Sequence, residues 1–355
     1  MTTRYRNFDA VRLYAASSVV FSHSFLIATG VEATEPLKST GLVTGVYGVF
    51  VFFILSGFLV TESAQRSATI GIFVRNRFLR IMPALVSSTL LVGYVLCPLF
   101  ATNGALAFIA DQKVFIRVIE IITFHSDNFY FPNLAFYPPL NKTDWLPGVA
   151  NGVLWTIRWE VTGYLFIGLM ATASLLKPKP QSWIILLATL AALVVLSFTY
   201  GRQVSTQWIS ELLFVVPSLC CGIFMTWLVR RHRPRGWIAL VLMAGVVPAT
   251  YFHVLPEVFP FLVAYPVIWL GSAPIPLLPR FYEKTDISYG IYLYGWPVIQ
   301  VLRHFVGPHL SGYELAALAL PVTILVAWLS WRFIEKPALG LKTSAKQQML
   351  PANPA

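Results

Sequence analysis

The chain has 355 residues, of which 57% are hydrophobic and 12% are charged, and its formal net charge is +11. Soluble globular domains carry about 25% charged residues, so this composition excludes a soluble protein. Apolar runs of spanning length recur along the chain and predict an all-α, polytopic integral membrane protein. We expect no strands, because strands that cross a membrane must close into a barrel.

About ten membrane spans are predicted. They cover residues 9–29, 42–61, 82–101, 150–172, 183–200, 207–229, 237–254, 258–272, 287–305 and 313–334. With the N- and C-termini cytoplasmic, 19 of the 26 Lys and Arg residues lie on the cytoplasmic side. This asymmetry follows the positive-inside rule and explains the net charge better than nucleic-acid binding does. The short span 258–272 has the weakest support, and omitting it would reverse the last two spans. One membrane domain, 1–340, and a short cytoplasmic tail, 341–355, are predicted.

The first span carries two ionisable residues on one face and is predicted to be a retained helix, since no cleavage site follows it. Arg12 and His23 are separated by eleven positions. They therefore lie within about 20° of each other around a helix and about 16 Å apart along it. Arg12 could simply anchor the helix at the membrane surface. His23 lies deeper, where it could accept a proton in catalysis or make a structural hydrogen bond between helices.

The region that follows contains small residues and then a pair of arginines. Gly48 and Gly57 stand among aromatic residues and predict close helix packing. Arg77 and Arg80 are spaced to share one helix face, where they could hold a phosphate. We place them in a cytoplasmic segment, with Pro83 in the first turn of the next helix. The alternative is an ordinary basic loop.

The long connection 102–149 is predicted to lie outside the cytoplasm. Residues 113–124 are apolar but too short to span, so this part is expected to lie in the membrane interface or to re-enter the membrane. Residues 125–145 mix aromatic, Asn, Pro and Asp side chains. This mixture suits a sugar-binding surface and equally suits an interfacial aromatic belt.

Two glutamates near span ends complete the set of candidates. Glu160 follows Arg158 and could orient an imidazole or a substrate hydroxyl, or could form an ion pair at the helix end. Glu335 closes the last span and is predicted to be structural, pairing with cytoplasmic arginines. Cysteines occur three times, all in apolar segments without metal or disulfide spacing, which predicts helix packing and no metal site. They are Cys97, Cys220 and Cys221.

Several short elements occur in a characteristic order. They are Arg12 with His23, Phe52 to Phe58, Arg77 with Arg80, Trp155 to Glu160, Ser288 to Leu293, and Glu335 to Pro337. Together they resemble the bacterial acyltransferase-3 superfamily of membrane O-acyltransferases, of the polysaccharide or lipopolysaccharide O-acetyltransferase type. The resemblance covers nearly the whole chain. Many members carry a His where this chain has Gly295, so any role of that His must be absent or filled elsewhere.

The resemblance implies transfer of an acyl group, usually acetyl, from cytoplasmic acyl-coenzyme A to a hydroxyl of an extracytoplasmic or lipid-linked carbohydrate. The enzyme would be a multi-pass protein of the bacterial inner membrane that uses acetyl-CoA and needs neither a metal nor nucleic acid. Arg77, Arg80 and Arg12 would hold the phosphates of the coenzyme. His23 would act as general base or carry the acyl group, and Glu160 would orient His23 or the acceptor.

Two other classes of protein remain open at this point. A transporter or flippase for a polar or glycolipid solute would also bury charged residues, although no inverted repeat or pair of broken helices is found. A purely structural membrane scaffold would leave His23 unexplained.

Overall fold

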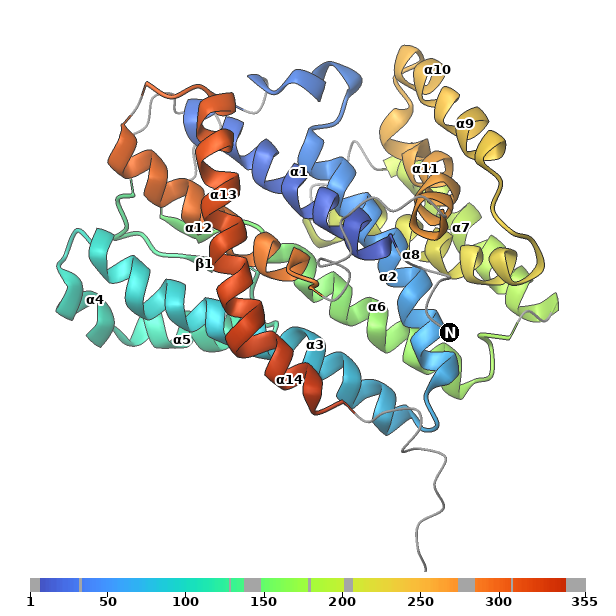
Figure 1. The fold of residues 1–355 in the computed structure, drawn as a ribbon, viewed down its shortest axis with the longest axis horizontal. Coiled ribbons are helices and arrows are strands. Elements are labelled where there is room, and N and C mark those ends of the chain that lie inside the picture. The colour runs from blue at the N-terminus through green and yellow to red at the C-terminus, as the bar shows by residue number, and fades with distance from the viewer. Residues whose placement is uncertain are drawn as a thin grey trace, which may run out of the picture.

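The computed structural model describes residues 7–31, 34–127, 129–136, 148–177, 180–200, 207–273, 285–307 and 309–342. Helices account for most of this part of the chain and pack side by side (Figure 1). The helices are α1 (Phe8–Thr29), α2 (Thr44–Arg66), α3 (Ile70–Leu91), α4 (Ala105–Ala110), α5 (Gln112–Ile122), α6 (Trp155–Thr172), α7 (Pro180–Tyr200), α8 (Gln207–Arg231), α9 (Gly236–Ala244), α10 (Val246–Tyr251), α11 (Leu255–Ser272), α12 (Ser288–Val306), α13 (Gly312–Ser330) and α14 (Lys336–Gly340). A π-helical turn, Trp331–Glu335, joins α13 to α14.

Every predicted span coincides with helical structure, and the all-α membrane class is confirmed. Six helices in the described part are long and apolar enough to cross a membrane. They are Phe8–Thr29, Thr44–Arg66, Ile70–Phe100, Ile209–Arg231, Leu255–Ser272 and Gly312–Gly340. The predicted span 237–254 is divided into α9 and α10. The total of ten spans and the cytoplasmic location of both termini stay predictions.

The third span begins earlier than the sequence suggested. The helix α3 starts at Ile70, where the hydroxyl of Thr69 accepts a hydrogen bond from the backbone N–H of Ile72 (3.3 Å). Arg77 and Arg80 therefore lie within the helix, and Pro83 lies in its interior rather than in a first turn. The prediction that Pro83 begins a helix was wrong, and the alternative of a basic loop is excluded for Arg77 and Arg80. A helix can carry arginines inward when side chains elsewhere in the fold neutralise or hydrogen-bond them, and this compensation is invisible locally.

Small residues set the closest helix contacts. The helix α1 packs against α2, α12 and α13, and α2 packs against α8. A Cβ atom on Gly57 of α2 would collide with the backbone of α8, and one on Gly222 of α8 would collide with α2. Gly48 likewise faces the backbone of α1. The predicted packing role of Gly48 and Gly57 is confirmed, because only glycine permits this separation.

The long connection after α3 folds back along that helix. The helix α5 contacts α3 and buries Val114, Val118 and Ile121, while Phe115 and Ile116 are exposed on its other side. Figure 1 shows α4 and α5 together at the end of the molecule remote from the start of α3. The expectation that residues 113–124 lie in the interface or re-enter the membrane stays a prediction.

Two short strands occur in this connection, where no strand was expected. The strand β1 (Phe129–Tyr130) pairs antiparallel with β2 (Val149–Asn151). The expectation assumed that any strand would span the membrane, whereas these two strands only join the ends of a loop. Within the described part of residues 125–145, three aromatic rings are buried and pack against other rings of the protein. They are Phe129, Phe131 and Phe136. Tyr137 and Trp145 lie outside the described residues.

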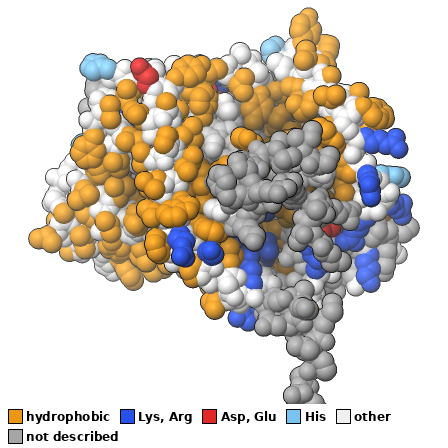
Figure 2. All heavy atoms as spheres, in the orientation of Figure 1, with side chains coloured by type: hydrophobic (Ala, Val, Ile, Leu, Met, Phe, Trp, Pro, Cys, Tyr) orange, Lys and Arg blue, Asp and Glu red, His pale blue; other side chains and the backbone are white. Residues whose placement is uncertain are grey.

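The molecular surface separates apolar and basic side chains. Hydrophobic atoms cover much of the face shown in Figure 2. The visible Lys and Arg side chains gather along the lower and right-hand sides of this view, which include the edge at which α2 ends. This distribution agrees with the charge asymmetry read from the sequence.

Candidate active site

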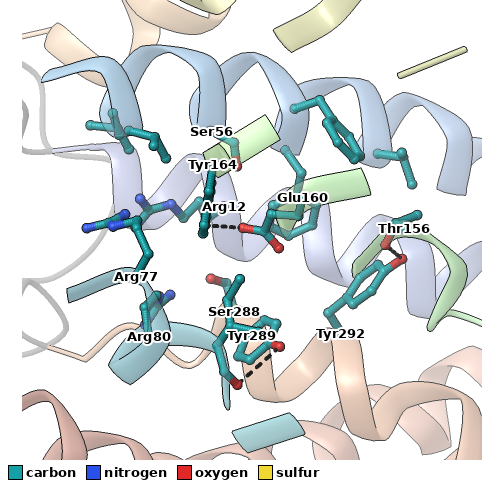
Figure 3. A pocket seen from close by; sticks show the side chains of 16 residues that line it. Arg12, Ser56, Arg77, Arg80, Thr156, Glu160, Tyr164, Ser288, Tyr289 and Tyr292 are labelled. Carbon is teal, nitrogen blue, oxygen red and sulfur yellow. Dashed lines mark hydrogen bonds between the residues drawn. The ribbon is translucent and has the colours of Figure 1, made fainter. Parts of the chain in front are cut away.

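A polar pocket opens between α1, α2, α3, α6 and α12. Ten of its lining side chains are polar or aromatic hydroxyl residues. They are Arg12, Ser56, Arg77, Arg80, Thr156, Glu160, Tyr164, Ser288, Tyr289 and Tyr292. Figure 3 shows the three arginines on one side, which we name the basic end, and Thr156 with Tyr292 on the other, which we name the hydroxyl end. The structure thus brings together Arg12, Arg77, Arg80 and Glu160 from three separate helices.

Asp286, which precedes α12, holds two of the arginines. Its Oδ2 atom lies 2.9 Å from Arg12 Nη1 and 2.6 Å from Arg80 Nη2. The hydroxyl of Ser288 donates to Oδ1 at 2.6 Å. Burial alone would raise the pKa of Asp286, but Arg80 and Arg12 outweigh it and hold this pKa well below its usual range. Asp286 is therefore ionised and fixes both guanidinium groups.

Arg80 has a second acid nearby. Glu335 Oε2 lies 4.0 Å from Arg80 Nη1, and the Glu335 side chain is only 2% exposed. The predicted pairing of Glu335 with an arginine is thereby confirmed. The guanidinium of Arg80 also lies over the ring of Tyr289, with 5.9 Å between Cζ and the ring centroid. The side chain of Arg80 is thus held from three directions.

Arg77 is held much more loosely. Its Nη2 atom donates to the hydroxyl of Ser63 at 3.4 Å, and its Cζ atom lies 5.6 Å from the ring centroid of Tyr164. Its Nε atom is buried without a hydrogen-bond partner, and within the described residues it forms no ion pair. A guanidinium carries five N–H donors. Arg77 therefore retains both charge and donors for an anionic ligand.

The segment after α14 adds a further basic residue, Lys342, near the basic end of the pocket. Arg75 donates from Nη2 to the backbone oxygen of Leu341 at 3.1 Å, which draws the segment after α14 onto α3. Burial, together with the charges of Arg77 and Arg80, lowers the pKa of the neighbouring Lys342 to about 7. An anion bound here would favour the charged form of this lysine.

Glu160 points into the pocket between the two ends (Figure 3). The hydroxyl of Tyr164, one turn further along α6, donates to its carboxylate. Arg158 does not help to position Glu160, because Arg158 Nη2 pairs with Asp127 Oδ2 at 2.9 Å and with Glu211 Oε2 at 2.8 Å. The ion pair at this helix end therefore belongs to Arg158, and Glu160 remains directed at the pocket.

The hydroxyl end is built from a short hydrogen-bonded chain. The hydroxyls of Thr156 and Tyr292 lie 2.6 Å apart, and Tyr292 donates to the backbone oxygen of Val153 at 2.9 Å. The ring of Phe52 meets that of Tyr292 edge to face, with 5.8 Å between centroids. These contacts make the hydroxyl end a fixed wall rather than a set of free side chains.

His23 lies apart from the lining of this pocket. Its ring meets Trp296 of α12 edge to face, with 4.8 Å between centroids. Its Nδ1 atom is buried and has no hydrogen-bond partner among the described residues. The indole of Trp296 in turn donates to the backbone oxygen of Val149 at 3.3 Å. His23 therefore sits where α1 meets α12 and the strand β2, with an unpaired imidazole nitrogen.

Gly295, where many members of the resembled family carry a His, is closely packed. A Cβ atom at this position would lie 2.6 Å from Cγ2 of Val20, one turn before His23 on α1. No side chain fits between the two helices without a shift. In this chain, the glycine at position 295 allows α12 to pack closely against α1.

Comparison with known proteins identifies the family of the chain. The model of a family described as an acyltransferase domain matches residues 5–332. The chain belongs to the acyltransferase-3 family. It is therefore an acyl-transferring enzyme, and its apolar helices make it a multi-pass membrane protein. No solved structure matches the chain.

Individual relatives of this acyltransferase cover most of its length. It is 28% identical to nodulation protein 10 of Rhizobium leguminosarum bv. viciae, over 95% of this chain and 94% of that protein. It is 27% identical to an O-acetyl transferase of Shigella phage Sf6, over 93% of this chain and 94% of that protein. Peptidoglycan O-acetyltransferase OatA of Listeria monocytogenes is 24% identical over 95% of this chain, which spans 57% of that longer protein.

Sequence reasoning missed three residues in or beside this candidate site. Asp286 lies next to the recognised element that begins at Ser288, but nothing local joins it to Arg12 or Arg80. Tyr164 lies four positions after Glu160, and this helical spacing was an available signal. Lys342 falls in the segment assigned to the tail, where no pattern marks it.

The cysteines take no part in the site. All three are free and buried, as the packing interpretation predicted. In the described part of the acyltransferase, no group of three or more His, Cys, Asp or Glu residues is arranged to hold a metal ion.

Proposed function

We propose that the protein transfers an acetyl group from acetyl-coenzyme A to a hydroxyl of a carbohydrate. The observation that carries this proposal is the basic end of the pocket, where Arg12, Arg77 and Arg80 meet around a space that continues past Glu160. Forked guanidinium groups suit the several phosphates of a coenzyme. The names of the phage and Listeria relatives support acetyl as the transferred group, and that of OatA supports a glycan as the acceptor.

The chemistry needs one proton acceptor and one positioned hydroxyl. The acceptor oxygen bonds to the thioester carbonyl carbon, the carbon–sulfur bond breaks, and coenzyme A leaves as the thiolate. His23 takes the hydroxyl proton and returns it to the sulfur, or it first carries the acetyl group itself. The unpaired Nδ1 of His23 supports either role, since the atom is not occupied by a structural hydrogen bond.

Glu160 is the second catalytic candidate. We assign it to orient His23 or the acceptor hydroxyl, and its direction into the pocket supports the acceptor role. Its carboxylate already accepts a hydrogen bond from Tyr164, which limits its rotation. A carboxylate held in one orientation can fix a sugar hydroxyl at low entropic cost.

The proposal also includes the membrane arrangement. We infer ten spans, cytoplasmic termini and location in the bacterial inner membrane, with an acceptor that is extracytoplasmic or lipid-linked. The gathering of basic side chains on the side of the molecule where α2 ends supports a cytoplasmic basic end. The donor would then enter from the cytoplasm and its thioester would be carried toward His23.

The test incubates the purified full-length protein, in lipid nanodiscs, with labelled acetyl-coenzyme A and glycans from a bacterial envelope. We expect label on the glycan and release of an equal molar amount of coenzyme A. Hydrolysis of the donor without glycan labelling, or no use of the donor, would contradict the proposal. Uptake of a glycan into protein-containing vesicles without any donor would favour the transporter instead.

A further inference from the structure

A second hollow lies on the other side of Arg77, between α3 and α6. We name it the lateral groove. Its lining is apolar apart from Arg77, Tyr164 and Thr172. Large side chains that line it are exposed in the described structure, including Val74 at 49%, Phe78 at 58% and Leu165 at 59%. The helix α3 forms part of a candidate membrane span, so these side chains have hydrocarbon rather than water available to them.

The lateral groove and the polar pocket share a wall. Arg77, Ile81 and Tyr164 line both of them. The guanidinium of Arg77 lies over the ring of Tyr164, so the two side chains form one partition. A molecule with an apolar tail in the groove would therefore place its polar head against Arg77 and next to Glu160.

One residue that lines the groove, Phe124, comes from outside α3 and α6 and has an unusual backbone conformation. Phe124 lines it and follows α5 with a φ of 60°, a left-handed backbone conformation that bulky side chains seldom adopt. The backbone N–H of His125 donates to the backbone oxygen of Glu120 at 2.8 Å. Hydrogen bonds of this kind end helices, and the left-handed residue that precedes the donor is usually glycine rather than a bulky residue such as Phe124. This strained conformation places an aromatic side chain in the lining of the groove.

Charge decides which lipid suits this site. Arg77 uses one donor in a long bond to Ser63 and pairs with no acid in the described part of the chain, whereas Arg12 and Arg80 are both held by Asp286. An uncharged lipid would leave the Arg77 guanidinium unpaired at the partition. A lipid phosphate would pair with it and still leave donors for the coenzyme, since a guanidinium can contact two anions.

We propose that the lateral groove binds the hydrocarbon chain of a lipid phosphate that carries the sugar acceptor, with the phosphate at Arg77. The tail stays in the bilayer while the sugar enters the polar pocket beside Glu160. This inference rests on the proposed acyl transfer to carbohydrate and specifies how the acceptor is held.

The experiment uses no acyl donor, so it is independent of the transfer assay. The probe is a polyprenyl phosphate with a photoreactive group on its hydrocarbon chain, added to full-length protein in phosphatidylcholine nanodiscs. We expect cross-links to peptides of α3 and α6. Leu165→Trp should lower them about tenfold, because the larger ring occupies the space of a few methylene groups. Leu325→Trp on α13 is the matched control, since Leu325 is 57% exposed and lies outside the groove.

A competition experiment tests the role of Arg77. Unlabelled polyprenyl phosphate should displace the probe at lower concentration than the uncharged polyprenol, and Arg77→Gln should remove this difference. Equal labelling of the Leu165→Trp and Leu325→Trp proteins would overturn the proposal. The proposal would also be overturned if polyprenol competed with the probe as well as polyprenyl phosphate does in the parent protein. Equally good competition by phosphatidylglycerol would overturn it too, because it would indicate binding of ordinary annular lipid. Cross-linking without acetyl transfer would support lipid binding in the lateral groove and refute the proposed enzymatic function. Acetyl transfer without cross-linking would refute only the proposed lipid binding.

Discussion

The basic end of the pocket and the His23 region represent two ways of placing ionisable groups in a membrane protein. At the basic end, Asp286 pairs with both Arg12 and Arg80, so a counter-charge holds these two guanidinium groups in place. In the His23 region, the imidazole meets an indole ring and its Nδ1 atom lacks a partner in the described structure. The first arrangement fixes the positions of the guanidinium groups, and the second leaves a reactive nitrogen atom available. Substitutions at the two places should therefore have different effects on stability and activity.

The largest expected effect is at His23. His23→Ala should lower the rate of acetyl transfer by roughly 10²–10⁴-fold, because a proton acceptor or acyl carrier is lost. The thermal unfolding midpoint should change little, since Nδ1 makes no structural hydrogen bond. Transfer rate and unfolding are measured on the same preparation. An unchanged rate would remove His23 from the mechanism, and a large loss of stability would assign it a packing role.

A smaller effect, mainly on stability, is expected at Asp286. Asp286→Asn keeps the shape of the side chain but leaves Arg12 and Arg80 without their counter-charge, which should cost about 3 kcal/mol of unfolding free energy. Asp127→Asn is the matched control, because Asp127 is also 18% exposed and also pairs with an arginine. Both variants should be less stable in denaturant titrations. Only Asp286→Asn should weaken donor binding, and equal donor affinities would contradict the assignment of the basic end.

Arg77 and Arg80 should differ although they share a helix face. Arg77→Ala should raise the KM for the donor about tenfold with little change in unfolding, because no acid among the described residues is left unpaired. Arg80→Ala should raise the donor KM and also destabilise the fold, because it removes the positive charge that pairs with Asp286 and Glu335. Arg117→Ala, in α5, is the control for the donor KM, which it should leave unchanged because Arg117 does not line the polar pocket. The same loss of stability in both variants would show that Arg77 is structural.

The smallest effect concerns pH. Because the pKa of Lys342 is lowered to about 7, its charge is lost as the pH rises through neutrality. An anionic donor binds the charged form better, so the donor KM of the parent should increase a few-fold between about pH 6 and 8. Lys342→Met should have the higher KM already at low pH and show less dependence on pH. An identical pH profile in both proteins would exclude Lys342 from donor binding.

The sequence allowed the helical segments to be predicted with useful accuracy, and four of its five candidate site residues line one pocket in the structure. Apolar runs locate helices because the bilayer demands them, and the spacing of Arg77 and Arg80 reports a shared face wherever the helix begins. The start of α3 was misjudged because charged residues normally mark a loop outside the membrane. The contribution of Asp286 was not predictable, since it is separated from Arg80 by 206 positions.

The sequence by itself determined the class of protein, the family and the identity of Arg12, His23, Arg77, Arg80 and Glu160 as candidates. Hydrophobic periodicity and short motifs are local, so they survive without a three-dimensional structure. Only the tertiary structure decided which candidates share a pocket and that Asp286 pairs with two arginines, whereas Arg77 forms no ion pair among the described residues. It also showed that a side chain at position 295 would collide with Val20 unless the helices shifted. These are contacts between helices far apart in the chain, and packing and electrostatics establish them only once the helices have assembled.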